Sequence, residues 1–352
     1  MFGRQWFEPG SQFALEEEAL TFERFLFKRS YSKAIELACE KIGTVRSVKE
    51  HRFWTRQQLR GIRLNQRSKT SSYISVAFRG FWPGFTQDDN EILNVLIEAA
   101  AVVGAEIKLD CIDPDLLVFS CFGDPGLNEF HRATRVLYLG ENVRPDFSIT
   151  DYSMTFDMSD YCGRNIYLPL WLLRSTKYAA TSVDYQPYKL TDLEQNRPAN
   201  NGEDVVVYIG NNSTPLRIEA IHELLKRGMA VECYGSQTKP VSDKIQTLSK
   251  YQYSLCFENT FTPGYVTEKI VDSFLGGSMP IYWGGAPPDV FNLEEYYACN
   301  PFQSMDDNIM EFLRWKRAKF RTTMPPLLKS GASAKTESCA IINLAKIFMN
   351  LF

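Results

Sequence analysis

The sequence predicts an α/β protein with two parallel sheets, one in each half of the chain. Short apolar runs alternate with segments of helical periodicity between residues 73 and 139 and again between residues 204 and 283. This alternation is typical of parallel sheets covered by helices. Residues 174–203 are polar and lack an apolar period, as expected of an interdomain linker. The 352 residues are enough for two domains of ordinary size.

The composition is that of a globular protein that works in water. Hydrophobic residues make up 44% of the chain, and the net charge is −3. A balance so close to neutral does not favour nucleic acid or another polyanion as partner. The first residues lack the pattern of a signal peptide, and no apolar run reaches the ~18 residues that a membrane span needs. We therefore expect a cytoplasmic protein.

The eight cysteines are scattered and contain no CxxC pair. This spacing argues against a metal cage and favours buried free thiols. Only three histidines exist, and none lies in a stretch that indicates chemistry. A carboxylate is therefore the better candidate for a general base.

Residues 1–70 are expected to form a helical extension. Five arginines in it recur at intervals of three or four residues: Arg52, Arg56, Arg60, Arg63 and Arg67. On a helix this spacing places all five on one face. Such a face could contact anionic lipid or a charged lipid-linked glycan at the inner face of the membrane. The alternative is a solvated face that pairs with acidic residues of this chain or of a second subunit.

The first domain is expected over residues 71–173. Its strands are predicted at 73–79, 105–110, 116–122 and 135–139, with a helix at 87–103. Phe81 and Trp82 follow the first strand, at the edge where parallel sheets bind ligands. They could form an apolar platform for a ligand, or they could cover the end of the sheet.

The Asp113-Pro114-Asp115 sequence places two carboxylates close together. Carboxylate oxygens are the ligands that hard divalent cations prefer. Here the pair precedes a strand and encloses a proline, so we expect a turn and not a metal site.

The second domain is expected over residues 204–300, with polar residues after two of its strands. A strand at 204–209 leads through Asn211 to a helix that has Arg217 in its first turn. A second strand ends at Phe257, and Glu258 and Asn259 follow it directly. The start of the next helix adds four more polar residues: Tyr265, Thr267, Glu268 and Lys269.

Arg217 and Lys269 are cations at helix starts, where the helix dipole disfavours positive charge. An anionic partner would remove this penalty, and the unpaired N–H groups at a helix start also favour an anion. A bound diphosphate would supply that anion. The alternative is a solvated first turn, in which Thr267 caps the helix and Glu268 complements its dipole.

Two segments of the chain resemble the α-1,3/4-fucosyltransferases, glycosyltransferase family 10. The first reads FEN, a short loop, then GYVTEK and PIYWG, between residues 257 and 284. The second is YLGENVRPDFSITDYSMTFD, from 138 to 157. The chain departs from the family pattern at Thr260 and at Gly210, where the family has serine; Thr260 keeps the hydroxyl and Gly210 does not.

The resemblance implies the GT-B architecture, in which two Rossmann-like domains face a central cleft. The first domain would bind the acceptor and the second the donor. The implied reaction is inverting transfer of L-fucose from GDP-β-L-fucose to a hydroxyl of an N-acetylglucosamine or glucose unit, in α-1,3 or α-1,4 linkage. The soluble bacterial branch of the family, and surface glycan or lipopolysaccharide synthesis, are implied as context. No cofactor is expected, and a divalent metal would at most stimulate.

The resemblance also implies roles for individual residues. Glu141 matches the glutamate that is the proposed general base of the family. Arg217 matches the arginine that binds the donor phosphates, and Asn211 the asparagine six residues before it. Lys269 would be the second phosphate-binding cation. The remaining donor-binding candidates are Glu258, Asn259, Tyr265, Thr267 and Glu268. The weaker acceptor-binding candidates, Phe81 and Trp82, rest on their place at the sheet edge and match no residue of the family.

Two other functions stay open from the sequence. One is a GT-B glycosyltransferase that uses another nucleotide-sugar donor. The other is a non-catalytic protein that binds nucleotide sugars or docks to membranes.

Residues 301–352 are expected to form helices at 305–319 and 338–352, and the last helix could cross back to the first domain.

Overall fold

The protein is described by a computed structural model over residues 72–130, 132–183, 185–211, 214–235, 238–318 and 323–351. The predicted helical extension at 1–70, with its five arginines, lies outside the described residues. Within the described ranges, no helix is both long and apolar enough to traverse a lipid bilayer.

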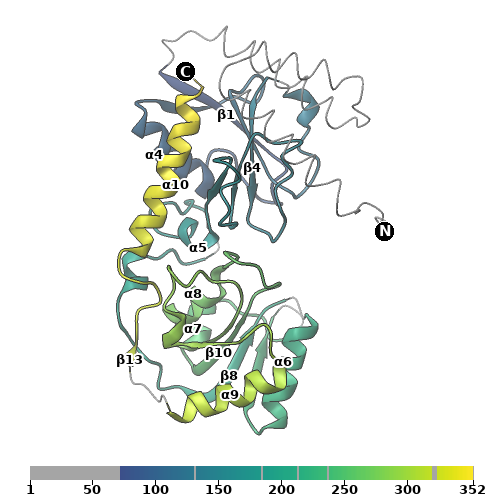
Figure 1. The fold of residues 1–352 in the computed structure, drawn as a ribbon, viewed down its shortest axis with the longest axis vertical. Coiled ribbons are helices and arrows are strands. Elements are labelled where there is room, and N and C mark those ends of the chain that lie inside the picture. Colours follow the sequence, from purple (N-terminus) through teal and green to yellow (C-terminus); the bar gives the residue numbers. More distant parts are fainter. Residues whose placement is uncertain are drawn as a thin grey trace. The chain divides into compact units, whose positions relative to one another are not determined.

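The first sheet has six parallel strands in the order β2-β1-β3-β4-β5-β6 (Figure 1). The strands are β1 (Tyr73–Arg79), β2 (Glu106–Leu109), β3 (Leu116–Phe119), β4 (Thr134–Leu139), β5 (Tyr152–Thr155) and β6 (Asn165–Tyr167). Every residue of β3, β4 and β5 is buried, so these strands form the centre of the first core. Helix α4 (Glu91–Val102) begins after Asn90, whose side chain accepts a hydrogen bond from the Leu93 N–H at 2.7 Å.

Asp115 fixes the pairing of β1 with β3. Its carboxylate accepts hydrogen bonds from the Ser75 N–H at 2.9 Å and from the Ser75 hydroxyl at 2.8 Å, and it is 8% exposed. The Asp113-Pro114-Asp115 sequence is therefore a structural turn, as the sequence predicts.

The second sheet has five parallel strands in the order β12-β11-β10-β8-β9. These are β8 (Glu203–Ile209), β9 (Ala230–Tyr234), β10 (Tyr251–Phe257), β11 (Met279–Trp283) and β12 (Tyr297–Ala298). Its helices are α6 (Pro215–Lys226), α7 (Lys244–Leu248), α8 (Glu268–Leu275) and α9 (Met305–Ala318). Figure 1 shows α6 and α9 side by side, in agreement with their contacts.

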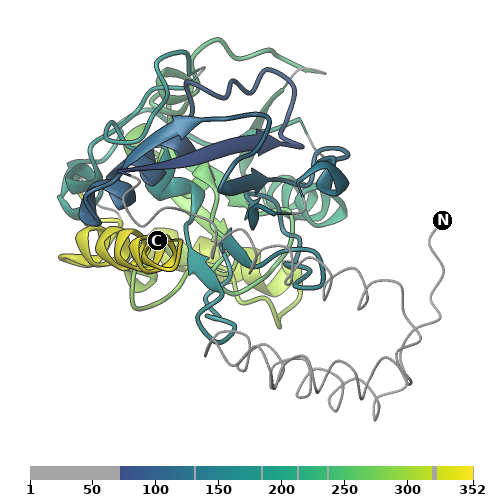
Figure 2. The ribbon, with the colours of Figure 1, turned by 90° about the horizontal axis from the view of Figure 1, so that it is seen from above.

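Short elements join the two sheets and lead to the last helix. They are α5 (Leu170–Leu173), η2 (Leu190–Glu194) and the antiparallel pair β7 (Arg197–Pro198) and β13 (Thr323–Met324). Two further 3-10 turns are η1 (Leu127–Glu129) and η3 (Leu293–Glu295). Helix α10 (Ala332–Met349) packs against α4 and β6 of the first sheet, and Figure 2 shows it on one face of that sheet.

Each sheet has one point where the chain reverses its direction of winding. In the first sheet the chain passes from β1 to β2 on one side and returns to β3 on the other. In the second sheet it passes from β8 to β9 and returns to β10. Ligands of open parallel sheets bind at the carboxyl ends of the strands that flank such a point. The β1/β3 and β8/β10 pairs therefore mark the two places to search for a site.

The cysteines differ from the sequence expectation. All those in the described part of the chain are free, and only Cys256 and Cys299 are buried. Four are exposed: Cys111, Cys121, Cys162 and Cys339. Burial was overestimated because the first three of these lie in loops that follow or connect strands, where the chain is at the surface, and Cys339 lies on the outer side of α10.

Candidate active site

Arg217 bridges the carboxyl ends of β8 and β10. It lies in the first turn of α6, which follows β8, and it is 2% exposed. Its Nη2 donates to the Phe257 carbonyl at 2.6 Å and to the Asn259 Oδ1 at 2.8 Å, both at the end of β10. Asn211 lies in the loop after β8 and is exposed. The structure thus brings Arg217 and Asn259 into contact at the reversal point of the second sheet, and Asn211 lies in the loop between β8 and α6.

A buried carboxylate organises the start of α8. Glu258 is 1% exposed and accepts hydrogen bonds from the Thr267 N–H at 2.8 Å and the Thr267 hydroxyl at 2.7 Å. The Lys269 ammonium lies 3.2 Å from the same carboxylate and donates to the Thr267 hydroxyl at 2.8 Å. Burial raises the pKa of Glu258, and the Lys269 cation opposes this shift.

This arrangement corrects two arguments made from the sequence. Lys269 does not need a bound diphosphate to offset the helix dipole, because Glu258 supplies the negative charge from within the protein. Thr267 precedes α8 but makes no side-chain capping bond to it, because its hydroxyl joins Glu258 to Lys269. Glu258 is covered by protein, and its carboxylate is occupied by Thr267 and Lys269.

A chain of charges extends from Lys269 along α8. Glu268 lies 3.8 Å from Lys269 and 3.6 Å from Lys244, and Lys244 pairs with Asp272 at 2.7 Å. Arg174, which follows α5, lies 3.8 Å from Asp272. Burial alone would raise the pKa of Glu268, but the three cations together lower it to about 2. Glu268 is therefore ionised at neutral pH.

Tyr265 and Gly264 lie where the loop after β10 meets the first sheet. The ring of Tyr265 is 2% exposed and packs edge-on against Phe156, which follows β5, at 4.8 Å between centroids. Gly264 has φ +87°, and a Cβ there would lie 2.3 Å from the Phe156 carbonyl oxygen. Only glycine fits this approach, because any larger residue would push the two segments apart.

Glu141 lies two residues after β4 and is exposed. The next residue, Asn142, donates its side-chain N–H to the Thr262 hydroxyl at 2.9 Å and also to the Thr260 hydroxyl. These bonds hold the loop of Glu141 against the loop after β10. The negative charge of Glu141 contributes to the raised pKa of Tyr265, after burial and Glu258. The predicted base therefore lies near enough to the predicted donor loop for its negative charge to act on Tyr265.

Phe81 and Trp82 lie in an aromatic cluster at the reversal point of the first sheet. Phe81 stacks on Phe85 at 4.0 Å, and Trp82 packs edge-on against Phe122, which follows β3, at 5.8 Å. Phe81 also stacks on Tyr138 of β4 at 6.2 Å. Both predicted residues are half-buried, so they cover the strand ends and still present part of their surface.

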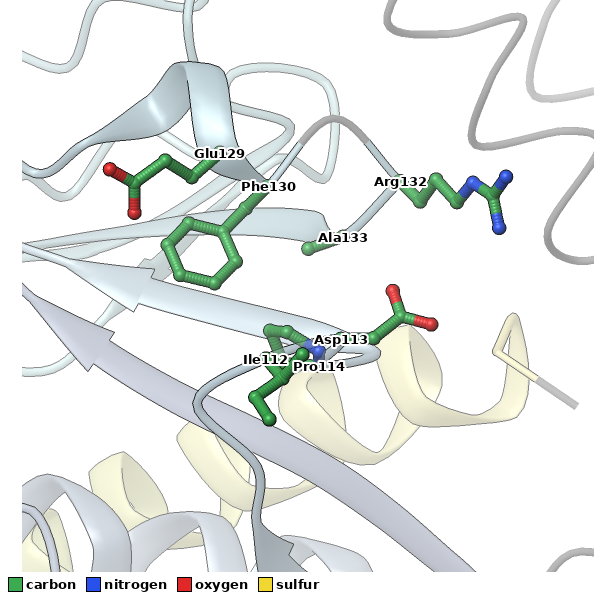
Figure 3. A pocket seen from close by; sticks show the side chains of 7 residues that line it. All are labelled: Ile112, Asp113, Pro114, Glu129, Phe130, Arg132 and Ala133. Atoms are coloured by element: carbon green, nitrogen blue, oxygen red, sulfur yellow. The ribbon is translucent and has the colours of Figure 1, made fainter.

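A separate cavity of about 280 Å³ lies at the opposite edge of the first sheet. It is lined by Ile112, Asp113, Pro114, Glu129, Phe130, Arg132 and Ala133, which precede β3 and β4 (Figure 3). None of the predicted site residues lines it. In the described ranges, no group of three or more histidine, cysteine or acidic residues is placed to hold a metal ion.

Two family models match the chain in succession. The model of the alpha-(1,3)-fucosyltransferase FucT N-terminal domain matches residues 76–174, and the C-terminal model of glycosyltransferase family 10 (fucosyltransferase) matches residues 200–321. Together they account for more than half of the chain. The chain belongs to glycosyltransferase family 10. The resemblance predicted from the FEN and GEN segments is thereby confirmed.

Individual relatives of this family 10 chain agree. It is 31% identical to the alpha-(1,3)-fucosyltransferase FucT of Helicobacter pylori, over 53% of this chain and 46% of that protein. It is 30% identical to the 4-galactosyl-N-acetylglucosaminide 3-alpha-L-fucosyltransferase FUT6 of Pan troglodytes, over 37% of this chain and 39% of that protein. The chain thus spans less than half of the length of these curated relatives.

The fold of the family 10 chain matches a solved structure. A crystal structure of an alpha1,3-fucosyltransferase with GDP-fucose aligns with a TM-score of 0.52 and 22% identity, over 81% of this chain and 91% of that one. This likeness confirms the predicted α/β fold of the GT-B type.

Sequence reasoning missed several residues that build the site of this family 10 chain. Lys244, Asp272 and Arg174 hold Glu268, but they are separated by long stretches of sequence and carry no motif. Asn142 lies inside the GEN segment, directly after Glu141, but no role was predicted for it. The signal was available, because an asparagine next to a candidate base can bind a neighbouring loop.

Proposed function

We propose that the protein transfers L-fucose from GDP-β-L-fucose to a hydroxyl of an N-acetylglucosamine or glucose unit of a glycan, with inversion at the anomeric carbon. One observation carries the proposal. The Asn142 side chain joins the loop of Glu141 to the loop that bears Asn259 and Tyr265, which supports a base from the first sheet acting beside a donor site on the second. The relatives support the donor and the acceptor, because one was crystallised with GDP-fucose and another is named for its action on N-acetylglucosaminides.

The donor diphosphate would bind between the carboxyl ends of β8 and β10. Lys269 offers a point charge at the start of α8, where the first N–H groups also favour an anion. Arg217 is 2% exposed, so its positive charge would act on the phosphates from beneath the surface, and through Asn259 it would fix the loop that encloses them. These groups stabilise the charge that develops on the leaving GDP.

Glu268 suits the hydroxyl groups of the donor. It carries a full negative charge at neutral pH and would repel phosphate, so it is better matched to hydroxyl donors of ribose or fucose. Asn259, which is exposed, would line the same part of the pocket, and Tyr265, which is 2% exposed, would support it from behind. Glu258 and Thr267 act behind them by orienting Lys269.

Glu141 would be the general base. Its carboxylate takes the proton of the acceptor hydroxyl as the oxygen bonds to C1 of fucose and the bond from C1 to the GDP oxygen breaks. A positioned base contributes about 10²–10⁴-fold to the rate. Phe81 and Trp82, at the neighbouring strand ends, would contact an apolar face of the acceptor. The linkage, whether α-1,3 or α-1,4, depends on this part of the first sheet.

The proposal extends to cofactors and location. We propose that no cofactor is needed, so that transfer persists in EDTA, and that the protein acts in a bacterial cytoplasm. Contact of the arginines at 52–67 with an anionic membrane would place it beside a lipid-linked acceptor in surface glycan synthesis.

A donor screen on the purified protein tests the function. GDP release is measured from GDP-fucose, and UDP or GDP release from GDP-mannose, UDP-glucose and UDP-N-acetylglucosamine, with and without N-acetyllactosamine. We expect release from GDP-fucose that rises with acceptor and falls about 10²–10⁴-fold in Glu141→Gln, while GDP affinity stays constant. Turnover of another donor in place of GDP-fucose would contradict the proposal, and normal turnover by the variant would remove Glu141 from its role.

A further inference from the structure

Three aromatic side chains, two exposed and one half-buried, form a ladder on the second sheet, beyond the proposed donor pocket. We call Phe261, Trp283 and Phe302 the aromatic ladder. The ring of Phe261 lies 5.9 Å from that of Trp283 and 6.4 Å from that of Phe302, and Trp283 continues inward to buried Phe257 at 6.1 Å. The rings come from the ends of β10, β11 and β12, three adjacent strands.

The ladder is exposed in a way that core packing does not explain. Phe302 is 91% exposed and Phe261 39% exposed. Several large aromatic side chains gathered on one surface commonly mark a binding site. A single exposed phenylalanine would need no explanation, but two exposed phenylalanines whose rings contact each other and a half-buried tryptophan do.

The ladder is also held in place. Asn300, two residues before Phe302, donates its N–H to the buried Asn308 side chain at 2.7 Å, and Asn308 donates back to the Asn300 carbonyl at 3.0 Å. The Phe302 N–H then donates to the Asn300 Oδ1 at 3.0 Å. The backbone thus presents the Phe302 ring on an anchored turn. An anchored turn loses less conformational entropy when a ligand binds than a mobile one would.

The position of the ladder selects its ligand. Phe261 stands between Thr260 and Thr262, the two hydroxyls that bind Asn142 beside Glu141. The donor phosphates belong to the other flank of β10, next to β8, where Arg217 lies. The ladder therefore adjoins the place where acceptor and base meet, and lies on the side of β10 that faces away from β8.

We infer that the aromatic ladder binds the apolar face of a sugar ring of the acceptor, one unit beyond the ring that receives fucose. A pyranose ring has an apolar face of C–H groups and a polar edge of hydroxyls. The ladder offers aromatic faces for the first, and the exposed Thr260 and Gln303 offer hydrogen-bonding groups for the second. This inference rests on the proposed function and adds an acceptor subsite from the donor-binding half of the chain.

Acceptor kinetics with sugars of different length test the subsite. The variants are Phe302→Ala and Phe261→Ala, with Phe302→Trp as the variant that keeps an aromatic face. Ile112→Ala serves as the matched control, because Ile112 is 88% exposed and lies at the opposite edge of the first sheet. The acceptors are N-acetylglucosamine, N-acetyllactosamine and the tetrasaccharide made of two N-acetyllactosamine units.

For Phe302→Ala we expect the KM for the disaccharide and the tetrasaccharide to rise about 5- to 10-fold, the size that loss of one aromatic contact gives. The KM for N-acetylglucosamine and for GDP-fucose should stay within twofold, and Phe302→Trp should restore the disaccharide KM. Unchanged acceptor KM values in both alanine variants, beside normal transfer by the wild type, would overturn the subsite alone. Equal rises for all three acceptors, or altered sedimentation of the variants with unchanged kinetics, would overturn it as well. If the wild type transfers fucose to none of the acceptors, the proposed function fails and the subsite fails with it.

Discussion

Glu258 shows how a single buried residue can position a partly exposed cation, because its carboxylate holds Lys269. The pattern FEN followed by GYVTEK suggested that the glutamate and the lysine both face the donor. The structure places the glutamate beneath the surface, where it binds Thr267 and Lys269. Burial of the carboxylate cannot be read from the sequence, because it depends on a distant segment: the Glu258 N–H donates to the Trp283 carbonyl at 2.9 Å, and the Glu258 side chain packs so close to Gly284 that a Cβ there would lie 2.7 Å from its Cγ.

The Glu258–Lys269 pair should be strongly coupled in folding. Loss of one partner of a buried pair costs about 3–5 kcal/mol, but the Lys269 side chain is 20% exposed and can turn to water. We therefore expect Glu258→Gln to lower the free energy of unfolding by about 1–3 kcal/mol. In urea denaturation, the Glu258→Gln/Lys269→Met double variant should lose less than the sum of the two single variants. Strict additivity would show that the pair does not interact.

The Glu268 carboxylate should make the free energy of unfolding depend on pH. Its folded pKa of about 2 lies below its ordinary value of 4.5, so its stabilising contribution is complete above pH 4.5 and is lost as the pH falls toward 2. We expect the urea midpoint of the wild type to fall more steeply over this interval than that of Glu268→Gln. The comparison is made at matched ionic strength, since salt screens the three cations. Parallel profiles of the two proteins would contradict the shift.

Among the secondary-structure elements, those with apolar periodicity were predicted and those held by polar networks were not. The strands that became β1, β3, β4, β8 and β10 were predicted within two or three residues, because apolar residues predominate in each. β5 and β6 were missed. Their residues include Ser153, Thr155 and Asn165, which bind one another in the core by hydrogen bonds of 2.8 and 2.9 Å. A strand whose buried side chains are polar carries no apolar signal.

The loop between β10 and α8 depends on close approach to the first sheet at Gly264. Gly264 and Gly84 share the same φ of +87°, but a Cβ at Gly84 would meet no atom within 4 Å. Gly264→Ala should therefore cost the backbone strain of about 1–3 kcal/mol together with the clash at Phe156, whereas Gly84→Ala costs the strain alone. We expect a clearly larger drop in the urea midpoint for Gly264→Ala and weaker GDP binding by calorimetry. Equal effects of the two substitutions would show that the segments can move apart freely.

At the scale of the whole molecule, the last helix connects distant parts of the chain. The sequence predicted this helix at 338–352, but α10 begins at Ala332 because its first turn is fixed from outside, by Glu194 of η2. The Glu194 carboxylate accepts hydrogen bonds from the N–H groups of Gly331 and Ser333, each at 2.9 Å, and from the Ser333 hydroxyl at 2.5 Å. A cap that comes from a residue 137 positions earlier in the chain leaves no local pattern.

Glu194 should therefore control how firmly α10 is held against α4. Burial alone would raise its pKa, but the hydrogen bonds from Ser333 and Gly331 lower it below the ordinary value of 4.5. Loss of a helix cap costs about 0.5–2 kcal/mol, so Glu194→Ala should lower the free energy of unfolding by this amount at neutral pH. Glu194→Gln, which keeps an acceptor oxygen but not the charge, should lose less.

The Glu194 effect should also shrink in acid, because a group with a lowered pKa contributes its stability above the ordinary value and loses it as the pH falls. Urea denaturation of the wild type and the Glu194 variants at pH 7 and pH 3 measures the loss of stability and its pH dependence. Unfolding is followed by circular dichroism and by tryptophan fluorescence. If α10 is part of one cooperative unit with the two sheets, the two signals shift together in Glu194→Ala. A shift in helical signal that leaves the fluorescence transition unchanged would show that α10 detaches alone, and that its packing on α4 does not stabilise the rest of the molecule.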